Sequence, residues 1–152
     1  GKYSAFEGGT RVPCIVSYPG KIKAGISDAL LSQIDLFASF ASLLNKELPN
    51  GAAPDSFDQL NAWMGKDKKG REYIIEQALT QTLSIATTKW KYIEPNGGKA
   101  INENTNTELG NSLKPQLYNI LKDPQEKKNL AEKHPAIVAR LAKRLEEVKT
   151  SK

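Results

Sequence analysis

The sequence contains very little cysteine, methionine and histidine, each of which occurs once in 152 residues. Because Cys14 is the only cysteine, no disulfide can form within the chain and no cysteine-based metal cluster can be built. Its apolar neighbours favour a buried thiol in a strand over a reactive nucleophile. The only histidine, His134, directly precedes Pro135, which predicts a surface or helix-capping residue without a catalytic role.

Long hydrophobic runs are also missing. No run approaches the roughly 18 apolar residues of a membrane helix, and no basic-then-apolar stretch resembles a signal segment. The sequence therefore predicts no membrane span. The apolar and charged fractions, 39% and 26%, are typical of a globular domain.

The charge pattern bears on possible partners. The net charge is +5, but lysines and arginines are scattered and interleaved with acidic residues. This pattern favours a solvated surface over a nucleic-acid patch, so we predict no nucleic-acid partner. The positive excess could still steer anionic substrates.

The first half of the sequence predicts a loop, a strand and two helices. Residues 1–11 are rich in glycine and polar groups and indicate a loop. Residues 12–18 are almost all apolar, which predicts a short strand covered on both faces. Ser32 and Asp35 are spaced as in a capping box, and the apolar stripe that follows predicts a well-buried helix. Residues 56–64 indicate a second, short helix.

The second half predicts a small sheet and a helix. The expected strands lie within residues 73–75, 82–88, 89–94 and 116–120. Residues 95–115 are expected to form a long loop, and a turn and short helix should follow over 123–132. Residues 135–148 have the apolar period of an amphipathic helix. Trp90 and Tyr92 alternate along their strand, which favours core packing over stacking on a sugar. These elements predict an α+β fold in which about four antiparallel strands are packed by the C-terminal amphipathic helix.

Four segments resemble sulfatase motifs, in the expected order. The opening residues Gly1-Lys2-Tyr3-Ser4-Ala5-Phe6-Glu7-Gly8-Gly9-Thr10-Arg11-Val12-Pro13 resemble the pattern G-K-x-x-x-aromatic-E-G-G-x-R-x-P. Tyr18-Pro19-Gly20, Trp90-Lys91-Tyr92-Ile93 and the segment from Leu117 to Leu130, with its Asp-Pro-Gln-Glu, resemble later motifs. The chain is therefore similar to the C-terminal portion of an arylsulfatase-type sulfatase, in the alkaline phosphatase-like superfamily.

The resemblance implies a domain organisation. The opening motif lies inside the sulfatase catalytic domain, so we expect the chain to be a C-terminal piece of a longer enzyme. Residues 1–65 would be the end of the catalytic domain, a strand-helix remnant, and residues 66–152 would be the C-terminal subdomain.

The resemblance also implies an activity. Such enzymes hydrolyse sulfate esters with a formylglycine made from a C/S-x-P-x-R motif and with a divalent cation, usually calcium. The stretch from Cys14 to Tyr18 lacks the required proline and arginine. We therefore expect the nucleophile and metal ligands upstream, no cofactor or metal in this chain, and no activity for the chain alone. The family favours a periplasmic or extracellular location.

Several residues of the chain are implied to serve the site of the parent enzyme. Lys2 aligns with the family lysine that contacts the sulfate oxygens, where an ammonium stabilises developing negative charge. Glu7 and Arg11 are expected to fix the loop through ionic hydrogen bonds, although a direct substrate contact by Arg11 is an alternative. The structural residues of the motif are Glu7, Gly8, Gly9, Arg11 and Pro13, the glycines allowing tight backbone geometry. Glu76, Gln77 and the 95–115 loop are candidates for the rim of the substrate pocket.

Two other functions fit parts of the sequence. A phosphate or phosphonate ester hydrolase of the same superfamily would share part of the opening loop. A stand-alone basic module that binds acidic glycans or nucleic acid would account for the charge but not for the opening motif. If the chain is a fragment of a sulfatase or of the related ester hydrolase, residues 12–18 and the helix after Ser32 would expose apolar faces. We therefore expect the fragment to self-associate, or these faces to dock on its sheet.

Overall fold

The structure is a computed structural model that describes residues 3–151. The chain forms two compact units. The sheet unit consists of Gly1–Pro13 with Ile75–Lys152, and the helical unit consists of Cys14–Ile74. The expected division at residues 65 and 66 concerns the domains of a longer enzyme and stays a prediction.

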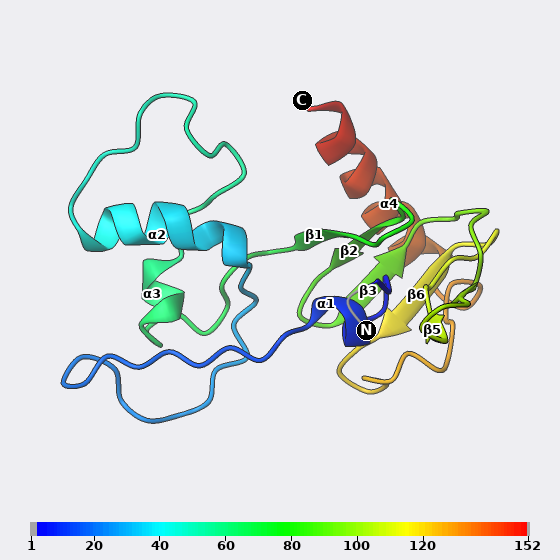
Figure 1. Cartoon of the computed structure of the whole chain (residues 1–152), viewed down its shortest axis with the longest axis horizontal. Helices are drawn as coiled ribbons and strands as arrows, with labels where there is room; N and C mark the ends of the chain where they lie inside the picture. Colours follow the sequence, from blue (N-terminus) through cyan, green and yellow to red (C-terminus); the bar gives the residue numbers. More distant parts are fainter. Residues whose placement is uncertain (1–2, 152) are drawn as a thin grey trace. The chain divides into compact units, whose positions relative to one another are not determined.

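The sheet unit contains the predicted four-stranded antiparallel sheet (Figure 1). Its strands lie in the order β1-β2-β3-β6, with the bounds β1 Ile74–Gln77, β2 Leu83–Ala86, β3 Trp90–Ile93 and β6 Gln116–Asn119. The register places Ile85 of β2 opposite Tyr92 of β3, and Lys91 of β3 opposite Tyr118 of β6. A small hairpin, β4 (Ile101–Asn102) with β5 (Thr107–Glu108), lies within the stretch predicted as a loop.

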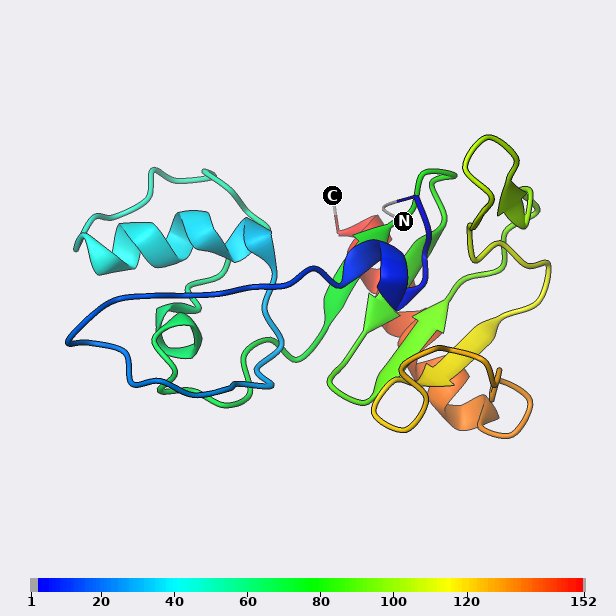
Figure 2. The same ribbon diagram turned by 60° about the horizontal axis from the view of Figure 1, so that its bottom comes forward.

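Helix α4 (Pro135–Thr150) covers one face of this sheet and contacts β2 and β3. Figure 2 shows α4 behind the sheet and the short helix α1 (Glu7–Thr10) in front of it. On the α4 face the Trp90 ring lies 5.2 Å from the His134 ring. Leu141 and Leu145 are the buried residues of the helix. The predicted amphipathic C-terminal helix is thus confirmed, with Pro135 in its first turn.

The opening segment forms the core on the opposite face. Ala5 packs with Ile93, Tyr118 and other buried side chains of the sheet unit. The Phe6 ring meets the Tyr118 ring edge-on at a centroid distance of 5.8 Å. The prediction of a loop over residues 1–11 is therefore wrong for Glu7–Thr10, which form a helical turn.

The helical unit is organised around a buried ion pair. Its elements are the 3-10 helix η1 (Gln33–Asp35), α2 (Leu36–Leu43) and α3 (Leu60–Trp63). The carboxylate of Asp35 is fully buried and accepts hydrogen bonds from Nε (2.6 Å) and Nη2 of Arg71. It also accepts the backbone N–H of Phe57 at 2.9 Å. The capping-box prediction is wrong because the Ser32 side chain makes no cap bond and Asp35 turns inward.

Several apolar segments predicted to be buried are exposed. Residues 12–18 form no strand, and Ile15 is 94% exposed. The Cys14 thiol is exposed rather than buried. On α2 only Ala38 and Ser39 are buried, whereas Phe37 and Phe40 are exposed. The predictions of a buried strand, a buried thiol and a well-buried helix are therefore wrong, because burial also requires a partner surface and no described strand pairs with residues 12–18.

Two shorter predictions were also inaccurate. The helix expected over residues 56–64 is limited to Leu60–Trp63. The helix expected before residue 132 is replaced by turns. There Asn129 Oδ1 accepts the backbone N–H of Ala131 at 2.9 Å, a donor that a helix would bond to a carbonyl, and also the N–H of Leu117 on β6 at 3.0 Å. No helix among the described residues is long and apolar enough to cross a membrane.

The Asp35–Arg71 pair predicts a large effect of its removal on stability. We expect Asp35→Ala to lower the free energy of unfolding by about 3 kcal/mol, because it leaves a buried guanidinium uncompensated. Asp28→Ala, which removes an exposed carboxylate, should change it by less than about 0.5 kcal/mol. Urea unfolding of both variants measures the difference, and equal effects would contradict the structural importance of the pair.

The exposed apolar side chains of the helical unit predict association. We expect the isolated 152-residue chain to self-associate, because a large apolar surface is unfavourable in water. Light scattering should show species larger than a monomer, and the double substitution Phe37→Ser with Phe40→Ser should reduce their proportion. A monomer that binds no hydrophobic dye would contradict this expectation.

Candidate functional site

The opening motif is attached firmly to the sheet unit. Lys2, the predicted sulfate contact, lies outside the described residues. The carbonyl of the next residue, Tyr3, accepts the backbone N–H of Leu79 at 3.2 Å. The backbone N–H of Ala5 donates to the Leu109 carbonyl at 3.0 Å. Gly110 follows with φ of +77°, and a Cβ there would lie 3.1 Å from the Ala5 Cβ. The chain is therefore held in place from the residue directly after Lys2.

Lys91 is the buried centre of the site. Its side chain is 0% exposed, although it carries a charge. Its Nζ donates to Glu7 Oε1 at 3.0 Å and to Thr10 Oγ1 at 2.9 Å, both on α1. It also forms an ion pair with Glu76 Oε2 of β1 at 2.7 Å. Two carboxylates and a hydroxyl thus replace the hydration shell of the ammonium, which is what a buried charge requires.

Glu76, predicted at the pocket rim, takes part in this cluster. Its Oε2 accepts a hydrogen bond from the Ser84 hydroxyl at 3.1 Å in addition to pairing with Lys91. Gln77 is exposed at the end of β1. Substrate contact by either residue stays a prediction, and the described contacts of Glu76 are with other side chains of the sheet unit.

Glu126 attaches the Asp-Pro-Gln-Glu segment to the opening motif. Its Oε2 accepts the backbone N–H of Glu7 at 2.6 Å. Its Oε1 is buried and has no hydrogen-bond partner among residues 3–151. Burial raises the pKa of Glu126 from 4.5 to about 7, and the Glu7 N–H and the Lys91 ammonium oppose that rise. A neutral carboxyl tolerates an unpaired buried oxygen better than a carboxylate does.

The remaining residues of the opening motif are less constrained. Arg11 Nη1 lies 3.8 Å from Glu7 Oε2, which is too far for a hydrogen bond, and the Arg11 side chain is 68% exposed. A Cβ added at Gly8 would meet no atom within 4 Å, so atoms of this chain give no steric reason for glycine there. Pro13 is exposed. The roles predicted for these residues in the parent enzyme stay predictions.

Sequence reasoning missed the two central residues of the cluster. The interleaved charges predict solvated lysines, and Glu126 stands out in the sequence only as part of a motif. The two-residue period of β3 was a usable signal, because it places Lys91 on the same face as Ile93, which is fully buried. A lysine between apolar positions of a central strand requires a buried anionic partner.

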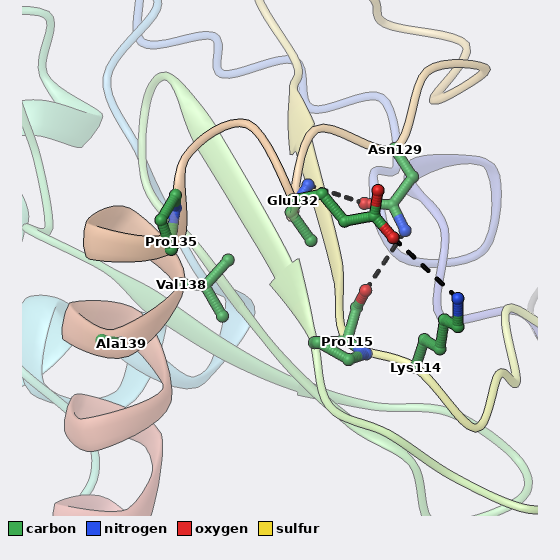
Figure 3. Close-up of a pocket in the computed structure, with 8 residues that line it drawn as sticks. Lys114, Pro115, Asn129, Glu132, Pro135, Val138 and Ala139 are labelled. Carbon is green, nitrogen blue, oxygen red and sulfur yellow. Dashed lines mark hydrogen bonds and ion pairs between the residues drawn. The ribbon is translucent and has the colours of Figure 1, made fainter.

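An open depression of about 550 Å³ lies elsewhere in the sheet unit, beside the first turns of α4 (Figure 3). Its walls include Pro115, Pro135 and Val138. The ammonium of Lys114 lies 3.9 Å from the carboxylate of Glu132, and both side chains are largely exposed. An exposed pair of opposite charges attracts anions weakly. This depression therefore gives no support to a sulfate site.

Among residues 3–151, no group of three or more His, Cys, Asp or Glu side chains could hold a metal ion. The described residues therefore do not fit the divalent cation that the resemblance to sulfatases implies.

The fold and the opening motif define the class of protein to which the chain is related. A four-stranded antiparallel sheet carries the C-terminal helix α4 on one face and the opening segment with its short helix α1 on the other. No family model matches the chain.

The chain is 53% identical over 150 residues to an N-acetylgalactosamine-6-O-sulfatase of Bacteroides thetaiotaomicron, covering 99% of this chain and 29% of that protein. It is 30% identical to human arylsulfatase A, covering 86% of this chain and 28% of the relative. A solved structure from work on glycosaminoglycan metabolism by Bacteroides thetaiotaomicron matches 97% of this chain and 31% of its own, with 53% identity and a TM-score of 0.94.

The chain belongs to the arylsulfatase-type sulfatases and corresponds to a C-terminal portion of them. It spans less than a third of the length of these relatives.

The unusual pKa of Glu126 predicts a pH-dependent stability. The pKa of Glu126 is higher in the folded state than the ordinary value of 4.5. The contribution of Glu126 to the free energy of unfolding is therefore full below pH 4.5 and is lost as the pH rises through about 7. Glu126→Gln keeps a neutral acceptor for the Glu7 N–H. Relative to the original protein, we expect this variant to gain stability between pH 4.5 and 8, by up to about 3 kcal/mol.

Urea unfolding at several pH values measures this effect. Glu132→Gln, which changes an exposed carboxylate, should show no comparable gain. Parallel stability curves for the original protein and Glu126→Gln would show that Glu126 has an ordinary pKa.

Proposed function

We propose that this chain is the C-terminal part of a sulfatase that removes the 6-sulfate from N-acetylgalactosamine in sulfated glycans. The observation that carries the proposal is the 53% identity, across 99% of the chain, to a relative bearing that activity in its name. The identity extends through the anchored opening motif and the sheet. The net charge of +5 suits a polyanionic substrate through long-range attraction.

Within such an enzyme the chain supplies Lys2. An ammonium directed at the sulfate oxygens stabilises the negative charge that develops as the ester bond breaks. The hydrogen bonds of Tyr3 and Ala5 support this role because they fix the backbone beside Lys2. A side chain attached to a fixed backbone loses less entropy when it binds the anion.

The proposal requires the nucleophile of the reaction to lie outside this chain. A formylglycine generated from a C/S-x-P-x-R motif would supply the nucleophile, with calcium bound by upstream residues. The segment around Cys14 has neither the proline nor the arginine of that motif. A periplasmic or extracellular enzyme would meet such glycans directly, and we propose that location.

The test uses the longer enzyme that contains this chain. We expect it to release sulfate from N-acetylgalactosamine 6-sulfate, and Lys2→Ala to lower kcat about 10²- to 10³-fold, the usual cost of losing one charge-stabilising donor. Lys23→Ala, which removes an exposed lysine, should retain full activity.

Two results would contradict the proposal. Hydrolysis of the matching phosphate ester in preference to the sulfate ester would indicate a phosphoryl hydrolase of the same superfamily. Salt-sensitive binding of acidic glycans without turnover would indicate a binding module.

A further inference from the structure

The Lys91 cluster joins three segments that are distant in sequence. Lys91 lies on β3, Glu76 on β1, and Glu7 and Thr10 on α1. Lys91 and Glu7 are separated by 84 positions. The backbone bonds of Tyr3 and Ala5 hold the segment that precedes α1. Glu126 accepts the first backbone N–H of α1, and the ammonium of Lys91 binds two side chains of α1.

The location of the charge within a core needs an explanation. Ala5, Ile93 and Tyr118 already provide apolar packing between the opening segment and the sheet. An apolar residue in place of Lys91 could extend that packing without the cost of removing an ammonium from water. Unlike apolar contacts, the ion pairs and the hydrogen bond are directional, so they define where Glu7 and Thr10 lie on the sheet.

We propose that Lys91 is a positioning residue that fixes α1 on the sheet. The fixed helix orients the backbone leading to Lys2, so that the ammonium of Lys2 is presented to the sulfate group. This inference rests on the proposed function for the role of Lys2. Its structural half, the placement of the opening segment by Lys91, does not depend on that function.

The first experiment tests the structural half on the 152-residue chain by hydrogen exchange. In Lys91→Met, we expect the backbone amides of residues 5–11 to exchange at least tenfold faster, while those at Leu141 and Leu145 of α4 keep their protection. Lys89→Met removes an exposed lysine of the same hairpin and should leave both regions unchanged. Unchanged exchange over residues 5–11 in Lys91→Met would overturn the proposal.

The second experiment tests the functional half in the longer enzyme with N-acetylgalactosamine 6-sulfate. Lys91→Met should lower kcat/KM about 10²-fold, the order expected for a displacement of about 1 Å at the reacting group. It should also weaken inhibition by inorganic sulfate. Because both effects act through Lys2, adding Lys91→Met to Lys2→Ala should cause little further loss. Additive losses would overturn the proposal.

A milder variant covers the case in which Lys91→Met does not fold. Thr10→Val removes one acceptor of Lys91 while the two carboxylates remain. We expect the same local increase in exchange and the same non-additivity with Lys2→Ala. The loss in kcat/KM should be several-fold rather than hundredfold. Loss of turnover with unchanged exchange would overturn the proposal.

The two experiments also separate the possible failures. If the unmodified longer enzyme shows no turnover of sulfate esters, the proposed function fails, and with it the role of Lys91 in sulfate hydrolysis. Faster exchange in Lys91→Met would then still establish that Lys91 places the segment. If turnover is present but exchange is unchanged, the proposed function stands and the positioning role is wrong.

Discussion

The buried ammonium of Lys91 is the interaction on which the sheet unit depends. Removing an ammonium from water costs several kcal/mol, and the low-dielectric interior returns this only when the geometry of the partners is good. Glu7, Glu76 and Thr10 meet that condition at 2.7–3.0 Å. If any one of these contacts moves away, the ammonium loses part of its compensation. The opening helical turn, the first strand and the third strand are therefore constrained to one arrangement.

This constraint unites motifs that are far apart in the sequence. Glu7 belongs to the opening motif, Lys91 to the Trp-Lys-Tyr-Ile strand, and Glu126 to the Asp-Pro-Gln-Glu segment. The Glu7 side chain binds Lys91, and its backbone N–H binds Glu126, which is 119 positions away. These motifs, which resemble separate sulfatase signatures, therefore form one physical assembly. The residues directly after Lys2 are attached to that assembly.

The strands and the last helix could be predicted from sequence, because their patterns match the surfaces that the sheet unit itself buries. The exposed residues of the helical unit show the limit of this reasoning. Phe37 and Phe40 repeat at helical spacing and do lie on a helix, but the pattern cannot supply the surface that covers them. The Lys91 cluster could not be predicted from the sequence for the opposite reason. Lysine usually lies at the surface, and only its two-residue spacing from Ile93 indicated that Lys91 faces inward.

Burial is the main cause of the raised pKa of Glu126, and the charges of the cluster modify it. Glu7 and Glu76 both raise the pKa of Glu126, while the Lys91 ammonium lowers it. Three ionised carboxylates would exceed the positive charge that Lys91 and the exposed Arg11 supply. A protonated Glu126 leaves two carboxylates against these two cations, and it still accepts the Glu7 N–H. Glu126 can thus hold the start of α1 without competing with Glu7 and Glu76 for the ammonium. This division of roles allows one lysine to join both carboxylates in a site that excludes water.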